Sequence, residues 1–130
     1  MKVKKTIVAG LIAMSLPVIA MATPLTIVNN TNQDSTSIIN NGMCSNALGP
    51  SGITRAHQTN VVPDVVLQNA CFFTPENCRA DIYMTNNCTG PKVATAMFSL
   101  KRGITGITGF TPNYALVMNG SFGLIMNSRT

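Results

Sequence analysis

The chain of 130 residues contains one histidine, His57, and an imidazole is the side chain most often used as a general base near neutral pH. Ser45, Ser51 and Asp64 lie nearby in the sequence, which makes a serine hydrolase arrangement one interpretation. The G-x-S-x-G elbow of many serine hydrolases is absent, however, and His57 stands in a polar stretch typical of a solvated loop. We therefore predict no catalytic residue, and a secreted hydrolase or toxin that uses His57 is the alternative.

Four cysteines, an even number, are the second set of residues with possible chemistry: Cys44, Cys71, Cys78 and Cys88. An exported chain would oxidise them to two disulfides. A Cys78–Cys88 bridge is disfavoured, because the strand expected between them spans about 23 Å at 3.3 Å per residue, whereas bridged Cα atoms lie within about 7 Å. Cys71 and Cys78 flank a short connection and are expected to face each other across the mouth of a hairpin. The favoured pairing is therefore Cys71–Cys78 with Cys44–Cys88, and Cys44–Cys78 with Cys71–Cys88 stays open.

Metal and cofactor motifs are missing from the sequence. No C-x-x-C pair is present, and the four carboxylates form neither a D-x-D nor an E-x-x-H pattern. The repeated glycines of GITGITGF lack both the spacing and the following helix of a nucleotide-binding loop. We predict no metal site and no cofactor.

The first 22 residues have the three-part layout of a secretory signal peptide. Three lysines within residues 2–5 precede the apolar run 6–20, and Ala20-Met21-Ala22 offers small residues for cleavage. The run is shorter than the roughly 20 residues of a membrane-spanning helix and contains Pro17. We predict a signal peptide at 1–22, a single domain at 23–130, no membrane span in the mature chain, and a secreted or periplasmic location.

Removal of this segment changes the charge of the protein. The whole chain has a net charge of +5, and the three lysines leave with the signal, so residues 23–130 carry six basic and four acidic side chains, or +2. The basic residues that remain are scattered and lack interleaved aromatic residues. We therefore predict no nucleic-acid partner.

Two segments are candidate binding surfaces. The polar stretch 85–91, held by Cys88, presents Asn86, Asn87 and Thr89 on a loop that a disulfide would make rigid. Phe72 and Phe73 follow Cys71, and an extended backbone would point one ring to the core and the other outward.

The elements that position these residues are predicted to be strands. Gly, Pro and Asn mark turns at short intervals, and short runs rich in β-branched residues stand between them. These runs are LTIV, TSII, VVLQNAC, RADIYMT, VATAMFSL, ITGITGF, YALVM and FGLIM. Thr54–Val62 is expected to be a helical turn or irregular loop, ITGITGF a bulged strand, and Asn119-Gly120 a two-residue hairpin turn. The fold class is all-β, a small antiparallel sandwich or barrel of seven or eight short strands stapled by disulfides.

Together these features indicate a small exported protein that acts by binding an unknown protein or surface partner without catalysis. Besides the His57 hydrolase, an enzyme inhibitor that presents a disulfide-anchored loop is a further alternative. Oligomeric state and ligand stay open.

Overall fold

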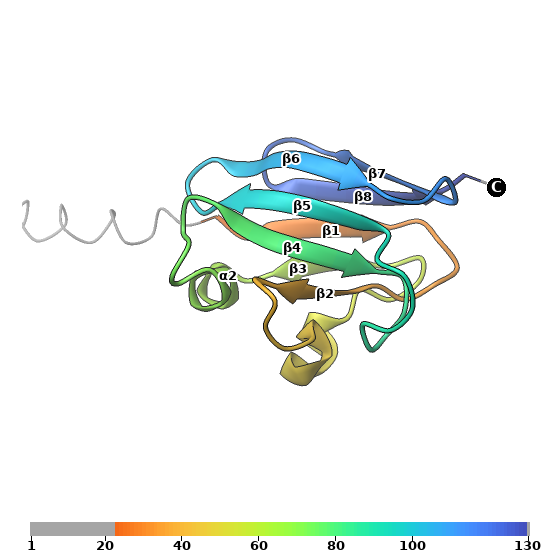
Figure 1. Cartoon of the computed structure of the whole chain (residues 1–130), viewed down its shortest axis with the longest axis horizontal. Helices are drawn as coiled ribbons and strands as arrows, with labels where there is room; N and C mark the ends of the chain where they lie inside the picture. The colour runs from red at the N-terminus through yellow and green to blue at the C-terminus, as the bar shows by residue number, and fades with distance from the viewer. Residues whose placement is uncertain (1–22, 130) are drawn as a thin grey trace, which may run out of the picture.

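The computed structural model describes residues 23–129 and shows two four-stranded sheets packed face to face (Figure 1). The first sheet has the spatial order β3 (Thr59–Val62), β1 (Leu25–Asn29), β8 (Gly123–Ser128), β7 (Tyr114–Met118). The second has the order β2 (Thr36–Ile39), β4 (Cys78–Tyr83), β5 (Ala94–Ser99), β6 (Gly103–Gly109). The predicted sandwich of short strands is confirmed. The predicted signal peptide, residues 1–22, lies outside the described residues.

Strand pairing is antiparallel within both sheets except between β1 and β8, which run parallel. Every second residue of a strand faces the core, as the buried Ile82 on β4 and the buried Ala94, Ala96 and Phe98 on β5 show. This alternation is the period-two pattern of the sequence. The predicted bulge is also present, because Met97 pairs with Gly106 and Phe98 with Ile104, leaving Thr105 as the extra residue of β6.

The run VVLQNAC, residues 65–71, was predicted as a strand, but residues 65–70 belong to the helix α2 (Asp64–Ala70) and Cys71 follows it. Pro63 precedes the helix in an extended conformation and Asp64 occupies its first turn, both of which favour a helix start. Leu67 and Cys71 are buried one turn apart on the face toward the sheets. Helical spacing of the apolar residues therefore outweighed the strand preference of Val65 and Val66.

Two further local predictions were wrong. Thr54–Val62 was expected to lack a strand, but its second half is β3, because it pairs along β1 from Leu25 to Val28. The β7–β8 hairpin exists, yet its connection comprises the four residues 119–122 rather than two. A two-residue turn at Asn119-Gly120 would pair Met118 with Ser121. Instead Met118 pairs with Leu124, and the Asn119 N–H donates a hydrogen bond to the Gly123 carbonyl at 2.9 Å. A 3-10 segment, η1 (Ser45–Gly52), lies between β2 and β3 along the chain.

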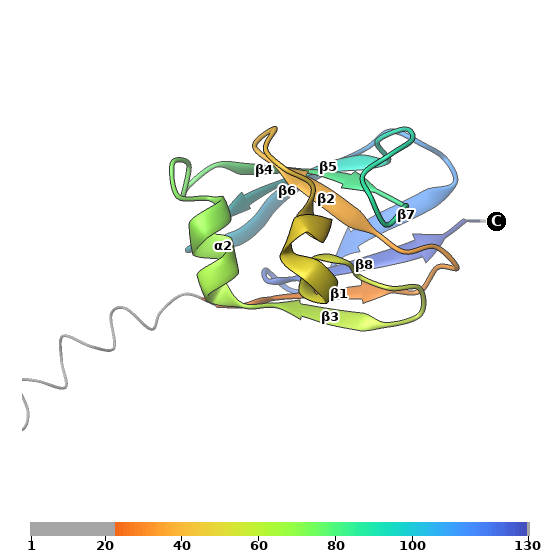
Figure 2. The same ribbon diagram turned by 90° about the horizontal axis from the view of Figure 1, so that it is seen from below.

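The edges of the two sheets lie closer together on one side of the sandwich than on the other. Strands β6 and β7 pack together on one side, whereas β2 and β3 are the free edges on the other. Figure 2 shows α2 and η1 side by side over the β2–β3 opening. These two short helical segments are therefore the lid over one flank of the sandwich.

Candidate functional site

His57 lies on an exposed loop with a positive φ of 60°. Its Nε2 is hydrogen-bonded to Asn32 Oδ1 at 2.6 Å. The four extended residues of β3, which span about 13 Å, lie between His57 and Asp64, the first residue of α2. The Asp64 carboxylate is therefore too far from the His57 imidazole to orient it. The structure does not bring together the residues of the hydrolase hypothesis.

Ser45, the second member of that hypothesis, has a structural environment. Its Oγ accepts the Ser37 N–H at 3.0 Å and donates to the Gly52 carbonyl at 2.6 Å. These two bonds join η1 to the edge strand β2. Ser45 therefore holds the lid in place rather than meeting His57.

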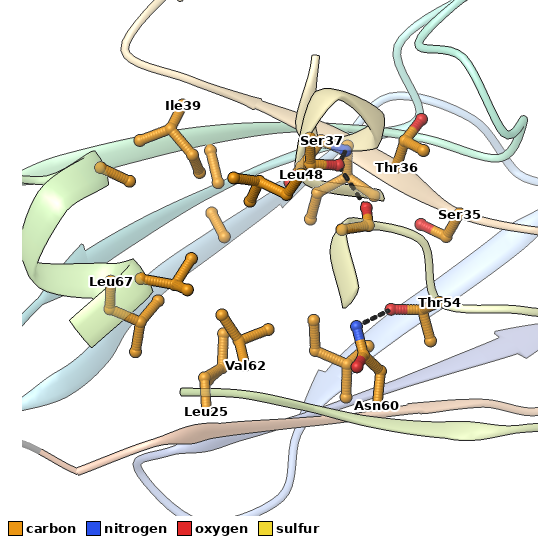
Figure 3. A pocket seen from close by; sticks show the side chains of 18 of the residues that line it. Leu25, Ser35, Thr36, Ser37, Ile39, Leu48, Thr54, Asn60, Val62 and Leu67 are labelled. Atoms are coloured by element: carbon orange, nitrogen blue, oxygen red, sulfur yellow. Dashed lines mark hydrogen bonds between the residues drawn. The ribbon is translucent and has the colours of Figure 1, made fainter. Parts of the chain in front are cut away.

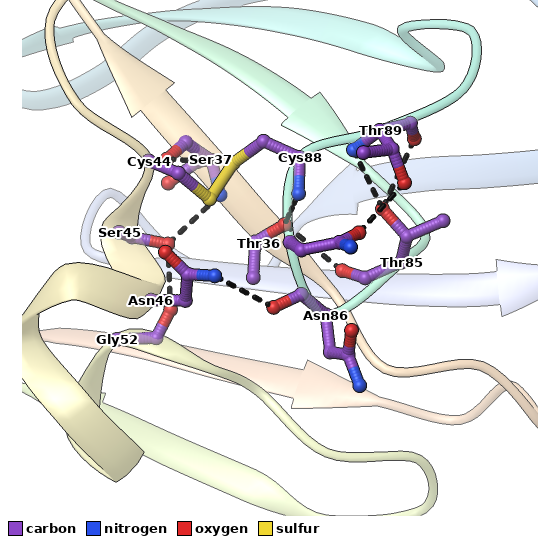
Figure 4. Close-up of a disulfide and its surroundings, with 11 residues drawn as sticks. Thr36, Ser37, Cys44, Ser45, Asn46, Gly52, Thr85, Asn86, Cys88 and Thr89 are labelled. Carbon is purple, nitrogen blue, oxygen red and sulfur yellow. Dashed lines mark hydrogen bonds between the residues drawn. A yellow bond between two sulfur atoms is a disulfide. The ribbon is translucent and has the colours of Figure 1, made fainter.

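Both disulfides attach lid segments to the second sheet. Cys44–Cys88, with Cα atoms 5.9 Å apart, joins the residue before η1 to the loop after β4 (Figure 4). Cys71–Cys78, with Cα atoms 5.5 Å apart, joins the end of α2 to the start of β4. This is the pairing favoured from the spacing, although the short bridge closes a helix-to-strand connection and not a hairpin mouth.

The predicted polar surface around Asn86, Asn87 and Thr89 is held by its own hydrogen bonds. Thr85 Oγ1 donates to the Thr89 carbonyl at 3.0 Å and accepts the Thr89 N–H at 3.1 Å. Thr89 Oγ1 donates to Asn87 Oδ1 at 2.6 Å, and Asn46 Nδ2 donates to the Asn86 carbonyl at 3.2 Å. The loop is thus rigid, and part of its hydrogen-bonding capacity is already used (Figure 4).

Phe72 and Phe73 are both exposed, at 69% and 91%, so neither ring enters the core as the extended backbone would require. They follow α2 in a turn and contact each other edge to face with ring centroids 5.0 Å apart. Figure 1 places the α2–β4 connection at one end of the sandwich and the β4–β5 loop at the other. The two predicted binding surfaces are therefore separate.

Asp81, on the outer face of β4, is the most buried carboxylate of the described residues. Burial raises its pKa, but the hydrogen bond from Thr95 (2.8 Å) and the bond and charge of Arg79 (3.1 Å), with Lys92 at 3.4 Å, hold the pKa below its ordinary value. Lys92 also lies over the Phe110 ring, 5.2 Å from its centroid. Every charge in this cluster has a partner, which is the pattern of a structural ion pair.

A large apolar cavity between the two sheets was missed by the sequence reasoning. Its volume is about 560 Å³, within the usual range of ligand sites. Ala80 and Ala96, which pair across β4 and β5, both line it. Two small residues opposite each other on an inner sheet face leave space that larger side chains would fill. This cross-strand alanine pair is the signal that could have indicated the cavity.

The mouth of the cavity lies between α2 on one side and η1 with the segment that precedes it on the other. Residues that line the cavity and are also exposed define it: Gly42, Met43, Ala47, Leu48, Ser51 and Ala70. Because Cys44, Cys71 and Cys78 line the cavity as well, the two disulfides fix both rims of this mouth.

The two ends of the cavity differ in chemistry (Figure 3). Leu25, Ile39, Val62 and Leu67 form an apolar end beside α2, and Ser35, Thr54 and Asn60 form a polar end. Ligand sites combine a mostly apolar lining with a few placed polar groups, and this cavity has that composition.

Neither metal ligation nor a membrane-spanning helix is visible in this part of the chain. Residues 23–129 contain no group of three or more His, Cys, Asp or Glu side chains that could hold a metal ion. The same residues contain no helix long and apolar enough to cross a membrane.

A family model of the type II secretion system substrate NttC matches residues 1–126 of the chain. The chain belongs to the NttC family. The crystal structure of the type II secretion substrate NttC of Legionella pneumophila is similar, with a TM-score of 0.67 and 26% sequence identity over 82% of this chain and 97% of that chain. No curated protein matches the sequence.

Family membership makes this NttC-family protein an exported substrate of the type II secretion system. The predicted export is thereby confirmed. Its two disulfides agree with that destination, since disulfides persist in oxidising compartments.

Proposed function

We propose that this exported NttC-family protein binds an apolar small molecule between its two sheets and acts by binding rather than catalysis. The observation that carries the proposal is the cavity of about 560 Å³ with its mouth between α2 and η1. Ligand sites are typically concave, mostly apolar and largely preformed. Both rims of this mouth are attached to the second sheet by disulfides, so binding requires little ordering.

Binding of an uncharged fluorescent probe to the purified protein tests the proposal. N-phenyl-1-naphthylamine should bind and gain fluorescence in the apolar cavity. Ala96→Phe, which fills the space between β5 and the opposite sheet, should weaken probe binding at least about tenfold, since tenfold corresponds to about 1.4 kcal/mol. Ala80→Leu fills the same space more conservatively and should act in the same direction.

Ala115→Phe is the matched control, because Ala115 lies on β7 and does not line the cavity. It should leave probe affinity unchanged. His57→Ala should also leave it unchanged, since His57 contacts Asn32 on the exposed loop. Absence of probe binding by the wild-type protein, or full binding by both cavity-filled variants, would contradict the proposal.

A second candidate function is docking on a lipid surface through Phe72 and Phe73, supported by the high exposure of both rings. Asn40 Nδ2 donates to Thr74 Oγ1 at 2.7 Å, which holds the turn that carries Met43 beside the loop that carries the two rings. Exposed Met43 also lines the mouth, so one exposed apolar side chain of the cavity lies on the turn that this bond joins to the loop of the two rings.

Co-sedimentation with phosphatidylcholine vesicles separates the two predicted surfaces. Changing Phe72 and Phe73 together to Ser should reduce the bound fraction at least about fivefold, because exposed Phe side chains bury apolar area at the boundary between lipid headgroups and acyl chains. Changing Asn86 and Asn87 to Ser should have no effect on vesicle binding. The opposite pattern would contradict the role of the two rings and transfer the lipid contact to the polar 85–91 loop.

A further inference from the structure

We propose that the ligand of this cavity is a single-chain amphiphile with an uncharged headgroup that bears a hydroxyl, such as a long-chain alcohol or a monoacylglycerol. The inference rests on the proposed function, because it names the ligand class of the same cavity. A fatty acid has the same tail and volume but an anionic head. The polar end of the cavity distinguishes between the two.

The cavity offers no charge to a ligand. Among residues 23–129, 29 line the cavity, and none of them is Asp, Glu, Lys, Arg or His. The charged residues adjacent in sequence to the polar end are Asp34 and Arg55, which pair with each other at 3.5 Å. An ionised carboxylate or phosphate would therefore lose water without gaining a cation.

The polar groups at this end match a hydroxyl. Asn60 Nδ2 donates to the Ser51 carbonyl at 3.0 Å and to Thr54 Oγ1 at 3.3 Å, which uses both amide hydrogens and leaves Oδ1 as an acceptor. Ser35 is only 3% exposed to solvent and lines the cavity. Among the hydrogen bonds of residues 23–129, its backbone pairs with Thr54 and its hydroxyl has no partner.

Figure 3 shows the Ser35 and Asn60 side chains at the same end of the cavity. A ligand hydroxyl can donate to Asn60 Oδ1 and accept from the Ser35 hydroxyl. A carboxylate is an acceptor only and would meet the Asn60 oxygen without a hydrogen between them. The geometry therefore favours an alcohol over the corresponding carboxylate.

The apolar end fits an alkyl chain. Leu25, Ile39, Val62 and Leu67 belong to β1, β2, β3 and α2, so the tail would touch both sheets and the lid. The volume of about 560 Å³ is nearly four times the roughly 150 Å³ cavity that holds a benzene ring. A chain of several carbons is accommodated where a single ring would leave most of the space unfilled.

Competition between matched ligands tests the headgroup. Decanol, decanoate and decane are compared at pH 7.5 for displacement of N-phenyl-1-naphthylamine from the wild-type protein. Decanol should displace the probe at least tenfold better than decanoate and better than decane. If the probe itself does not bind, the proposed function and this inference fail together. If the probe binds and decanoate competes as well as decanol, only the headgroup inference is overturned.

Variants of Asn60 and Ser35 test whether these two residues cause the preference for an alcohol headgroup. Asn60→Leu removes the acceptor and should abolish the advantage of decanol over decane, whereas Ser35→Ala should reduce it with a smaller change in shape. Asn60→Lys supplies a cation and should invert the preference toward decanoate. Asn113→Lys, on the exposed β6–β7 connection outside the cavity, is the control and should preserve the wild-type order. An unchanged ligand order in both Asn60 variants would overturn the assignment of the headgroup site.

Discussion

The side-chain amide of Asn29 donates a hydrogen bond to the Thr54 carbonyl at 3.1 Å, across 25 residues of sequence. Asn29 is fully buried at the end of β1, and Thr54 forms the bridge with Ser35 at the polar end of the cavity. The same amide donates to the Gln33 carbonyl at 2.7 Å, while Oδ1 accepts from the Thr31 hydroxyl at 2.7 Å. One asparagine therefore fixes the backbone that carries the proposed headgroup site.

Asn29→Asp should destabilise the protein by about 3 kcal/mol, because two buried donors are lost and a charge replaces them. Thermal unfolding at neutral pH measures the effect. Asn30→Asp is the control, since Asn30 is exposed and its Nδ2 bonds Asn127 at the surface. It should cost less than about 1 kcal/mol. Equal melting temperatures for both variants would show that the Asn29 network contributes little.

Asp81→Asn should lower the free energy of unfolding at pH 7 by about 2 kcal/mol, because charged hydrogen bonds to Arg79 and Thr95 are weakened. The folded pKa of Asp81 is lowered, so its contribution is complete above the ordinary carboxyl pKa of about 3.9 and is lost as the pH falls through the folded value. The stability difference between wild type and variant should therefore shrink below about pH 4. Denaturant unfolding over pH 2–7 measures it, and a difference that grows on acidification would contradict the ion-pair account.

The disulfide-deficient double variants should differ in stability. In the chain-entropy model, the Cys44–Cys88 bridge, with a sequence separation of 44, stabilises by about 4 kcal/mol, and Cys71–Cys78, with a separation of 7, by about 2.5 kcal/mol. Changing Cys44 and Cys88 to Ser should therefore cost more than the same change at Cys71 and Cys78. Denaturant midpoints with their slopes give the two free energies, and the reverse order would show that strain or packing dominates.

Gly103→Ala should destabilise the protein by about 2 kcal/mol, because Gly103 has a φ of 86° and an added Cβ would collide with the Ser121 carbonyl. Gly106→Ala, in the same strand, is the matched control, since a Cβ there meets open space. It should change stability by less than about 1 kcal/mol in either direction. Comparable losses in both variants would indicate that β6 tolerates no side chain at either position.

Local chemistry accounts for the part of the fold that the sequence could predict. Alternation on β4 and β5 and the Gly, Pro and Asn turns depend on neighbouring residues, so the strands were recognisable without tertiary information. The reach of an extended strand disfavoured a Cys78–Cys88 bridge, and the short connection between Cys71 and Cys78 favoured the pairing that the structure shows.

The helix α2 and the cavity depended on contacts that local patterns do not contain. Val65 and Val66 indicated a strand, but the burial of Leu67 and Cys71 against the sheets selects a helix. Phe72 and Phe73 point outward for the same reason, because the chain turns at the end of that helix. Residues as distant as Leu25 and Ala96 meet across the cavity only when both sheets have formed.

The sequence by itself therefore determined an exported, disulfide-stapled all-β domain, either a sandwich or a barrel, since export signals, alternation and turns are all local features. Only the tertiary structure decided that β2 and β3 remain apart, with Ala80 opposite Ala96 behind them. The unequal closure of two sheets is a property of their packing, and packing joins residues that the sequence keeps far apart.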